Sequence, residues 1–207
     1  MAKSCCDNGC NIEKILTARY RKALWIALAI NLAMFFVEML GGFSSGSVSL
    51  MADAIDFFGD AANYGISLAA LSMGLLWRAR AAALKGLTMG GFGIFVLAKA
   101  LWTFKTGATP EPFTMGAIGA IALVANTSVA LMLFKFREGD ANMRSVWLCS
   151  RNDAIGNVAV MLAAFGVFGS GSAWPDLLVA IIMAGLSLSA AAHILKRAFI
   201  ELKATKD

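Results

Sequence analysis

Six long apolar stretches, separated by short polar or turn-forming segments, dominate this sequence of 207 residues. They lie at about 23–43, 47–76, 81–104, 113–134, 145–169 and 174–195. A helix needs roughly 20 apolar residues to cross a bilayer. Lipid offers no partner for unpaired backbone groups, so we expect each stretch to be helical. The sequence therefore predicts an all-α integral membrane protein with six transmembrane helices.

The composition excludes two other classes of protein. Hydrophobic residues make up 59% of the chain and charged residues 15%. Soluble domains average roughly 45–50% apolar and about 25% charged residues, and disordered chains have low hydrophobicity. An ordinary soluble enzyme and a disordered protein are both excluded. The net charge of +5 does not indicate a nucleic-acid partner, because the positions of the basic residues explain it better.

Basic residues gather in alternate polar segments. They lie before the first apolar stretch, in the second and fourth breaks, and after the last stretch, whereas the third break contains Lys105 and the first and fifth contain none. Because cytoplasmic segments are enriched in Lys and Arg, we expect both termini in the cytoplasm. The predicted organisation is a cysteine-containing cytoplasmic tail at 1–21, a transmembrane domain at 22–197 and a short cytoplasmic tail at 198–207.

The second apolar stretch contains three acidic residues, Asp53, Asp56 and Asp60. Offsets of three and four residues put all three on one face of a helix. A charge at bilayer depth is costly, and such residues usually face a cavity or a partner. The apolar stretches offer only Lys85 and Lys99 as basic partners. A bound cation is therefore the simpler source of positive charge.

The fifth stretch supplies a second polar group, formed by Cys149, Asp153 and Asn157 at intervals of four residues. Together with Asp56 and Asp60, Asp153 and a fourth donor could form the tetrahedral site that Zn²⁺ usually takes. Carboxylate ligands also admit Mn²⁺ and other divalent ions, and a thiolate favours softer ones. The fourth donor stays open: Cys149 is a ligand or a buried thiol, and Asn157 is a ligand or orients an acid.

Other polar residues also interrupt the apolar stretches. Asp53 is an accessory ligand or a contact to the first or third helix, and Glu38 is the next candidate for a cation or proton path. Three asparagines are expected to form hydrogen bonds between helices: Asn31, Asn63 and Asn126.

Three cysteines cluster in the N-terminal tail as CCDNGC: Cys5, Cys6 and Cys10. Disulfides are disfavoured in the cytoplasm. The cluster therefore predicts capture of a soft metal ion such as Zn²⁺, Cd²⁺ or Cu⁺. The alternatives are idle thiols or redox chemistry.

Two segments resemble the cation diffusion facilitator family of metal transporters. They are NLAMFFVEMLGGFSSGSVSLMADAIDFFGDAANYGISL and CSRNDAIGNVAVMLAAFGV, and the resemblance extends over roughly 22–197. The run S-G-S-x-S-L-x-A-D-A followed by D-x-x-x-D is its most specific part. Asp56 and Asp60 match the family's metal-binding pair on the second helix, and Asp153 matches the aspartate on the fifth. The usual histidine falls on Cys149, which leaves the ion preference open.

The resemblance implies a multi-pass secondary transporter without a prosthetic group. A small chain with basic residues on its cytoplasmic side fits a bacterial inner membrane. Such proteins export Zn²⁺ or related ions (Cd²⁺, Co²⁺, Ni²⁺, Mn²⁺ or Fe²⁺) from the cytoplasm in exchange for protons, often as homodimers. Family members commonly have a C-terminal cytoplasmic domain, and we expect this chain to be a short member lacking it.

Antiport also follows from the ligand chemistry, and two alternatives remain. Carboxylates and thiols must lose protons to bind metal, so metal entry expels protons. Membrane phosphatidyltransferases of the CDP-alcohol class also use D-x-x-x-D, but the D-G-x-x-A-R that precedes it in those enzymes is absent before Asp56. The other alternative is a membrane metal sensor that does not transport.

Overall fold

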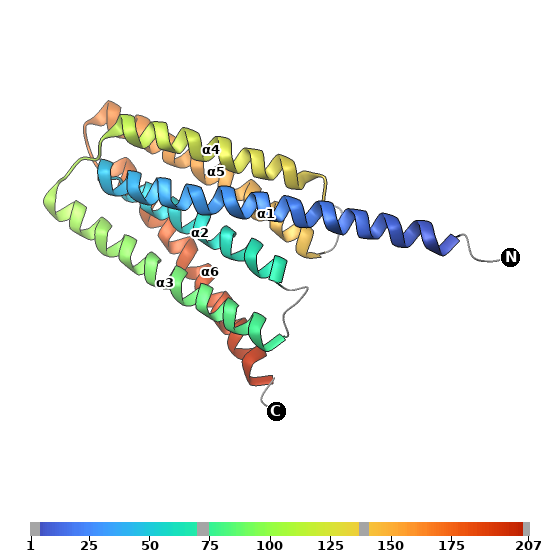
Figure 1. The fold of residues 1–207 in the computed structure, drawn as a ribbon. Helices are drawn as coiled ribbons and strands as arrows, with labels where there is room; N and C mark the ends of the chain where they lie inside the picture. The colour runs from blue at the N-terminus through green and yellow to red at the C-terminus, as the bar shows by residue number, and fades with distance from the viewer. Residues whose placement is uncertain (1–4, 70–74, 137–140, 205–207) are drawn as a thin grey trace.

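The computed structural model describes the backbone of residues 5–69, 75–136 and 141–204, and side chains from residue 18 onward apart from 75, 78, 141–152, 197 and 201. Within these residues the chain forms six helices and no strand (Figure 1). The helices are α1 (Cys5–Ser45), α2 (Val48–Ala69), α3 (Leu75–Thr106), α4 (Pro112–Phe134), α5 (Ala141–Ser170) and α6 (Trp174–Ala204). The predicted all-α fold is confirmed.

Five of the described helices are long and apolar enough to cross a membrane. These spans are Ala18–Ser45, Ala79–Thr106, Pro112–Phe134, Asp153–Ser170 and Trp174–Ile200. The exception is α2, whose sequence contains three aspartates. Its 22 residues nevertheless extend about 33 Å at roughly 1.5 Å per residue, enough to cross a hydrocarbon core of about 30 Å. The chain is a multi-pass integral membrane protein.

The helix boundaries differ from the apolar stretches at both ends of the chain. We expected the first helix to begin near residue 23, but α1 begins at Cys5. Likewise α6 continues to Ala204, beyond the end of its apolar stretch near 195. Hydropathy detects only the part of a helix that matches lipid, whereas the backbone hydrogen bonds continue into polar sequence. The described part of α2 ends at Ala69.

The helices form two groups, visible in Figure 1: α1, α2, α4 and α5 pack together, and α3 and α6 lie side by side. A Cβ atom at Gly86 of α3 would lie 2.8 Å from Cγ of Leu195 in α6. Glycine therefore permits the close approach of these two helices. The two groups converge at the end where α1 joins α2 and diverge toward the end where α1 begins and α6 finishes.

Polar caps close the helices at the converging end. Asp176 of α6 caps α2, because its carboxylate accepts hydrogen bonds from Ser47 Oγ at 2.7 Å, Val48 N at 2.8 Å and Ser49 N at 3.1 Å. Glu111 caps α4 by accepting from the two following backbone N–H groups. Hydrogen bonds from Thr114, followed by that from the Phe113 N–H, hold the pKa of Glu111 below its usual range.

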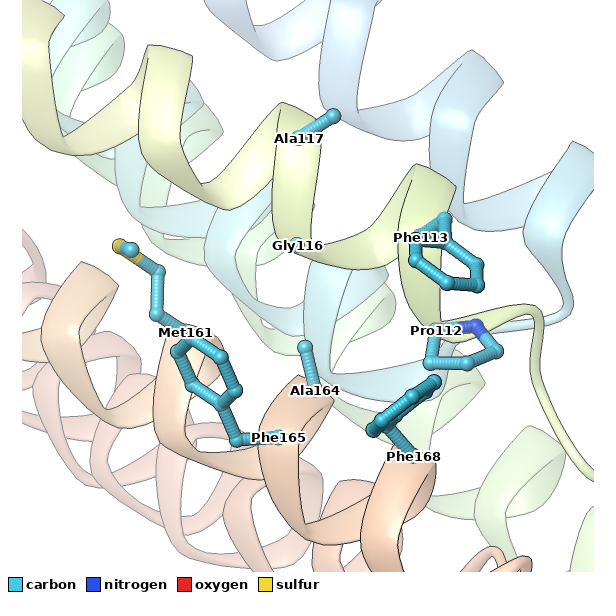
Figure 2. Close-up of a pocket in the computed structure, with 8 residues that line it drawn as sticks. All are labelled: Pro112, Phe113, Gly116, Ala117, Met161, Ala164, Phe165 and Phe168. Carbon is cyan, nitrogen blue, oxygen red and sulfur yellow. The ribbon is translucent and has the colours of Figure 1, made fainter.

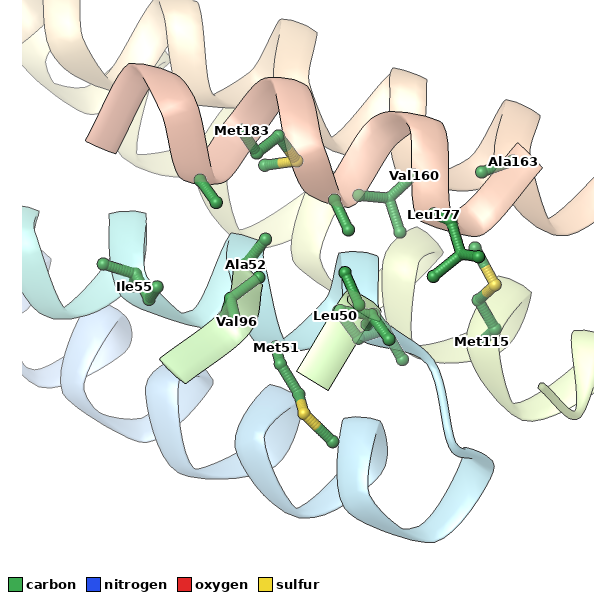
Figure 3. Packing of buried hydrophobic residues seen from close by; sticks show 14 of the residues in the cluster. Leu50, Met51, Ala52, Ile55, Val96, Met115, Val160, Ala163, Leu177 and Met183 are labelled. Carbon is green, nitrogen blue, oxygen red and sulfur yellow. The ribbon is translucent and has the colours of Figure 1, made fainter. Parts of the chain in front are cut away.

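The largest apolar cluster surrounds α2 (Figure 3). It joins buried residues of five helices, among them Leu50, Ile55, Val96, Met115, Val160 and Met183. The outer surface is also apolar: Leu40, Phe165 and Leu186 are each more than 60% exposed. Water would make such a surface prone to association, whereas lipid accepts it. The interior position of α2 keeps its aspartates away from that lipid-facing surface.

Candidate metal centre

The three aspartates of α2 share one face, as predicted. Asp53 and Asp60 are buried and Asp56 is half-buried. The carboxyl group of Asp56 interacts electrostatically with those of Asp53 and Asp60. Helix α2 contacts α1, α3, α5 and α6. The acidic stripe is therefore enclosed by protein on several sides.

Asp60 forms a contact between α2 and α5. Its carboxylate accepts a hydrogen bond of 2.7 Å from the hydroxyl of Tyr64, one turn along α2. It also makes a side-chain hydrogen bond with Asp153 of α5. Asp60 and Asp153, which the sequence predicts to belong to one site, are thus in contact. The spacing of four residues between Asp60 and Tyr64 was a usable signal for the tyrosine, which we did not predict.

Asp56 connects the stripe to α6. Ser187 Oγ donates a hydrogen bond of 2.9 Å to Asp56 Oδ1. Ser187 is itself buried. No motif or spacing singled it out, because its relation to Asp56 depends on how α2 and α6 pack. The carboxylates therefore lie among three helices, α2, α5 and α6.

Asp53 belongs to a separate hydrogen-bond chain. Asn157 Nδ2 of α5 donates to Asp53 Oδ2, and Asn126 Nδ2 of α4 donates to Asn157 Oδ1 at 2.9 Å. Both polar ends of Asn157 are thus engaged by protein groups. This arrangement places Asn157 where it can orient Asp53, one of the two roles the sequence left open.

Glu38 of α1 lies next to Asp53 and is fully buried. Among the described residues, both of its carboxylate oxygens and Asp53 Oδ1 lack a geometrically acceptable hydrogen bond. Asp53 is nevertheless its strongest electrostatic neighbour, and the two carboxyl groups are near enough to form a hydrogen-bonded pair of poor geometry when one of them is protonated. The two accessory candidates from the sequence are therefore brought together. Buried polar atoms without partners are costly, so Glu38 and Asp53 remain candidates for binding a proton or a cation.

Lys85 of α3 is a basic partner of the stripe, although the sequence favoured a bound cation as the source of positive charge. It is buried, its Nζ donates to Asn63 Oδ1 of α2, and it interacts electrostatically with Asp60. The sequence named Lys85 only as one of two lysines within apolar stretches. Its partner could not be identified without the packing of α2 against α3.

The predicted asparagine contacts have mixed outcomes. Asn63 and Asn126 form hydrogen bonds between helices, as expected. The prediction is wrong for Asn31, whose Nδ2 donates at 2.8 Å to Ala27 O in its own helix. The backbone carbonyl one turn earlier in α1 is the acceptor instead.

Several predicted donors lie outside the described side chains. They are Cys149 and the tail residues Cys5, Cys6 and Cys10. Among the described side chains, no three His, Cys, Asp or Glu residues are grouped closely enough to hold a metal ion. The tail site, the fourth ligand and the binding of one ion by Asp56, Asp60 and Asp153 together therefore stay predictions.

An apolar groove lies between α4 and α5, away from the carboxylates (Figure 2). Phe113 and Phe168 form one side of it, with ring centroids 5.5 Å apart. Gly116, Met161 and Ala164 contribute to the rest of its wall. Its lining contains no titratable side chain, so the groove is not part of the candidate centre.

Comparison with known proteins identifies the family. The sequence model of the cation efflux transmembrane domain matches residues 24–76 and 78–202. The match therefore includes all the carboxylates described above. Together with the apolar helices, the bacterial relatives described next support an inner-membrane location.

Three bacterial relatives are similar along most of this chain. They are the metal cation efflux system protein CzcD of Cupriavidus metallidurans (26% identical, 89% of this chain and 60% of the relative), a cadmium, cobalt and zinc/H(+)-K(+) antiporter of Bacillus subtilis (24%, 85% and 61%) and the zinc transporter ZitB of Escherichia coli (27%, 87% and 62%). The chain thus spans about three fifths of the length of these relatives. It belongs to the cation efflux family, whose members are transporters and not enzymes.

Proposed function

We propose that this protein is a secondary transporter that exports a Zn²⁺-like divalent cation from the cytoplasm in exchange for protons. The proposal rests chiefly on one observation: inside a bundle whose outer surface is apolar, Asp60 of α2 interacts both with Asp56 on its own helix and with Asp153 of α5. The names of the relatives, which include zinc, cadmium and cobalt transporters and an antiporter with H(+), agree with this activity.

In this proposal Asp56, Asp60 and Asp153 hold the cation. Cys149 lies one helical turn before Asp153 on α5 and is our candidate for the fourth ligand. Asn157 orients Asp53 through its amide. Three carboxylates and one thiolate suit Zn²⁺ and also admit Cd²⁺ or Co²⁺.

The excess of acidic groups supports exchange of metal for protons. Five acidic side chains form a chain of neighbouring pairs: Glu38, Asp53, Asp56, Asp60 and Asp153. Lys85 supplies one positive charge beside them. Ionised groups inside a membrane protein need compensation. A divalent cation or protons can provide it, and metal binding displaces the protons.

The two helix groups suggest how the site is reached from each side. The α3–α6 pair diverges from the other helices at the end where α1 begins and α6 finishes (Figure 1). Arg19, Arg21 and Lys22 of α1 and Lys203 of α6 belong to the helix segments at that end. We assign this end to the cytoplasm by the positive-inside rule. Rocking of one helix group against the other is the usual mechanism of alternating access.

Vesicle transport provides the test. Asp60→Ala or Asp153→Ala should reduce metal-driven proton movement in reconstituted vesicles by about a hundredfold or more, since each removes a proposed ligand. Glu111→Ala, which changes an exposed carboxylate at the start of α4, is the matched control and should transport normally. Zn²⁺, Cd²⁺, Co²⁺, Ni²⁺, Mn²⁺ and Fe²⁺ should be compared in the same assay.

The same assay distinguishes transport from metal sensing. A sensor binds the cation, but it moves neither metal nor protons across the membrane. Unchanged flux in both the Asp60 and Asp153 variants would contradict the proposed site.

A further inference from the structure

Lys85 occupies an unusual position for a lysine in a membrane helix. Its side chain is only 7% exposed, and its Nζ donates a hydrogen bond to Asn63 Oδ1 on the neighbouring helix α2. Lysine is almost never fully buried unless it is paired. The interior of this protein therefore holds a fixed positive charge beside the acidic stripe.

The packing of α2 provides space for this lysine. Gly59 precedes Asp60, and a Cβ atom at Gly59 would lie 4.0 Å from Lys85 Cε and 3.1 Å from Met89 Cε. Two side chains of α3, Lys85 and Met89, thus pack against α2 at Gly59, which has no side chain. The absence of a side chain at Gly59 lets the stem of Lys85 approach α2 close to Asp60.

Asp60 is the point at which this lysine meets the proposed cation site. The carboxylate of Asp60 interacts with Tyr64, Asp153 and Lys85. A divalent cation held by Asp60 and Asp153 would be repelled by the ammonium of Lys85. The cation and the ammonium therefore compete for the same negative charge.

We propose that the ammonium of Lys85 competes with the cation for the carboxylate of Asp60 and thereby determines the cation selectivity of this site. The ammonium of Lys85 already supplies one positive charge, so replacing it with a monovalent ion such as Na⁺ or K⁺ improves the electrostatic interaction with the carboxylates little. A divalent ion carries twice the charge, interacts more favourably with the carboxylates and displaces the ammonium. This inference rests on the proposed function, because it assigns Lys85 a role at the same site.

The inference is tested by titrating Zn²⁺ into the purified full chain in detergent at constant pH. Lys85→Met and Lys85→Gln should bind Zn²⁺ about tenfold more tightly than the wild type. Lys85→Gln also separates charge from structure, because glutamine keeps a donor for Asn63 but has no charge. Lys85→Arg should bind Zn²⁺ as the wild type does. Lys99→Met, in the same helix, is the matched control.

Transport in vesicles gives a second measurement. Zn²⁺ flux by the wild type should be unaffected by Na⁺ or K⁺ at about 0.15 M, whereas both uncharged variants should be inhibited several-fold. If Lys85→Gln has wild-type affinity and no sensitivity to Na⁺, the lysine is structural and the inference is overturned. If the wild type itself neither binds nor transports Zn²⁺, the proposed function fails instead.

Discussion

Asp176 and Glu38 are both fully buried carboxylates, but they have opposite hydrogen-bond environments. Asp176 accepts three hydrogen bonds from the start of α2. In the described part of the chain, neither carboxylate oxygen of Glu38 has a geometrically acceptable donor. The first lies at the converging end of the bundle, and the second faces the acidic stripe.

The difference separates structural acids from acids available for exchange. A buried carboxylate with donors directed at its oxygens is satisfied by the fold and stabilises it. A buried carboxylate without donors costs stability, and retaining it indicates a function for the charge. Burial alone therefore does not distinguish Glu38 from Asp176, whereas the hydrogen-bond donors around each carboxylate do.

The largest effect on stability is expected at Asp176. Asp176→Ala leaves three buried donors at the start of α2 without an acceptor and should lower the free energy of unfolding by about 3–5 kcal/mol, since each unsatisfied buried donor costs roughly 1–3 kcal/mol. Unfolding by a denaturing detergent in mixed micelles, followed by tryptophan fluorescence, measures the change. The folded fraction should still bind Zn²⁺ with wild-type affinity.

The matched control is Glu111→Ala, which also removes a helix-capping carboxylate but an exposed one. Glu111→Ala should lower the free energy of unfolding much less than Asp176→Ala, because water replaces the lost acceptor. An equally small loss for Asp176→Ala would remove the distinction between the two buried carboxylates.

A smaller effect of opposite sign is expected at Glu38. Glu38→Gln removes the charge, and the new amide can donate to Asp53 Oδ1, which lacks a geometrically acceptable donor in the described structure. The free energy of unfolding should stay unchanged or rise by about 1–2 kcal/mol. The same mixed-micelle titration measures it. A decrease of more than about 1 kcal/mol would mean that Glu38 is a structural acid like Asp176.

The smallest effect on stability is expected at Asn126, which is an amide and therefore neither a structural acid nor an acid available for exchange. Asn126→Ala removes the donor to Asn157 Oδ1 and should lower the free energy of unfolding by about 1 kcal/mol. Because Asn157 remains bonded to Asp53, transport in vesicles should fall by less than about tenfold. Complete loss of transport would place Asn126 and Asn157 in the cation site itself.

The sequence was sufficient to predict what depends on local spacing. Hydropathy located the helices, and offsets of three and four residues placed Asp53, Asp56 and Asp60 on one face. The contact of Asp60 with Asp153 was also anticipated, because both segments resemble a known family. These features depend on helix periodicity or on motifs within single segments.

The features that the sequence did not reveal depend on packing between distant helices. The pairs Ser187–Asp56 and Asp176–Ser47 are separated by more than 120 positions along the chain. The hydrogen bond from Lys85 to Asn63 also joins two helices. Nothing in the spacing of these residues specifies which partner each one meets. The length of α1 was missed for another reason, since its first turns are polar and do not match lipid.

The acidic character of α2 has a consequence for how the protein is made. An aspartate near the centre of a membrane helix opposes insertion by about 2.5–3.5 kcal/mol, and α2 has three. Only the short segment Gly46–Ser47 separates it from α1, against which it packs extensively. We therefore expect α2 to enter the bilayer as the second arm of a hairpin with α1, sheltered by its neighbours during synthesis.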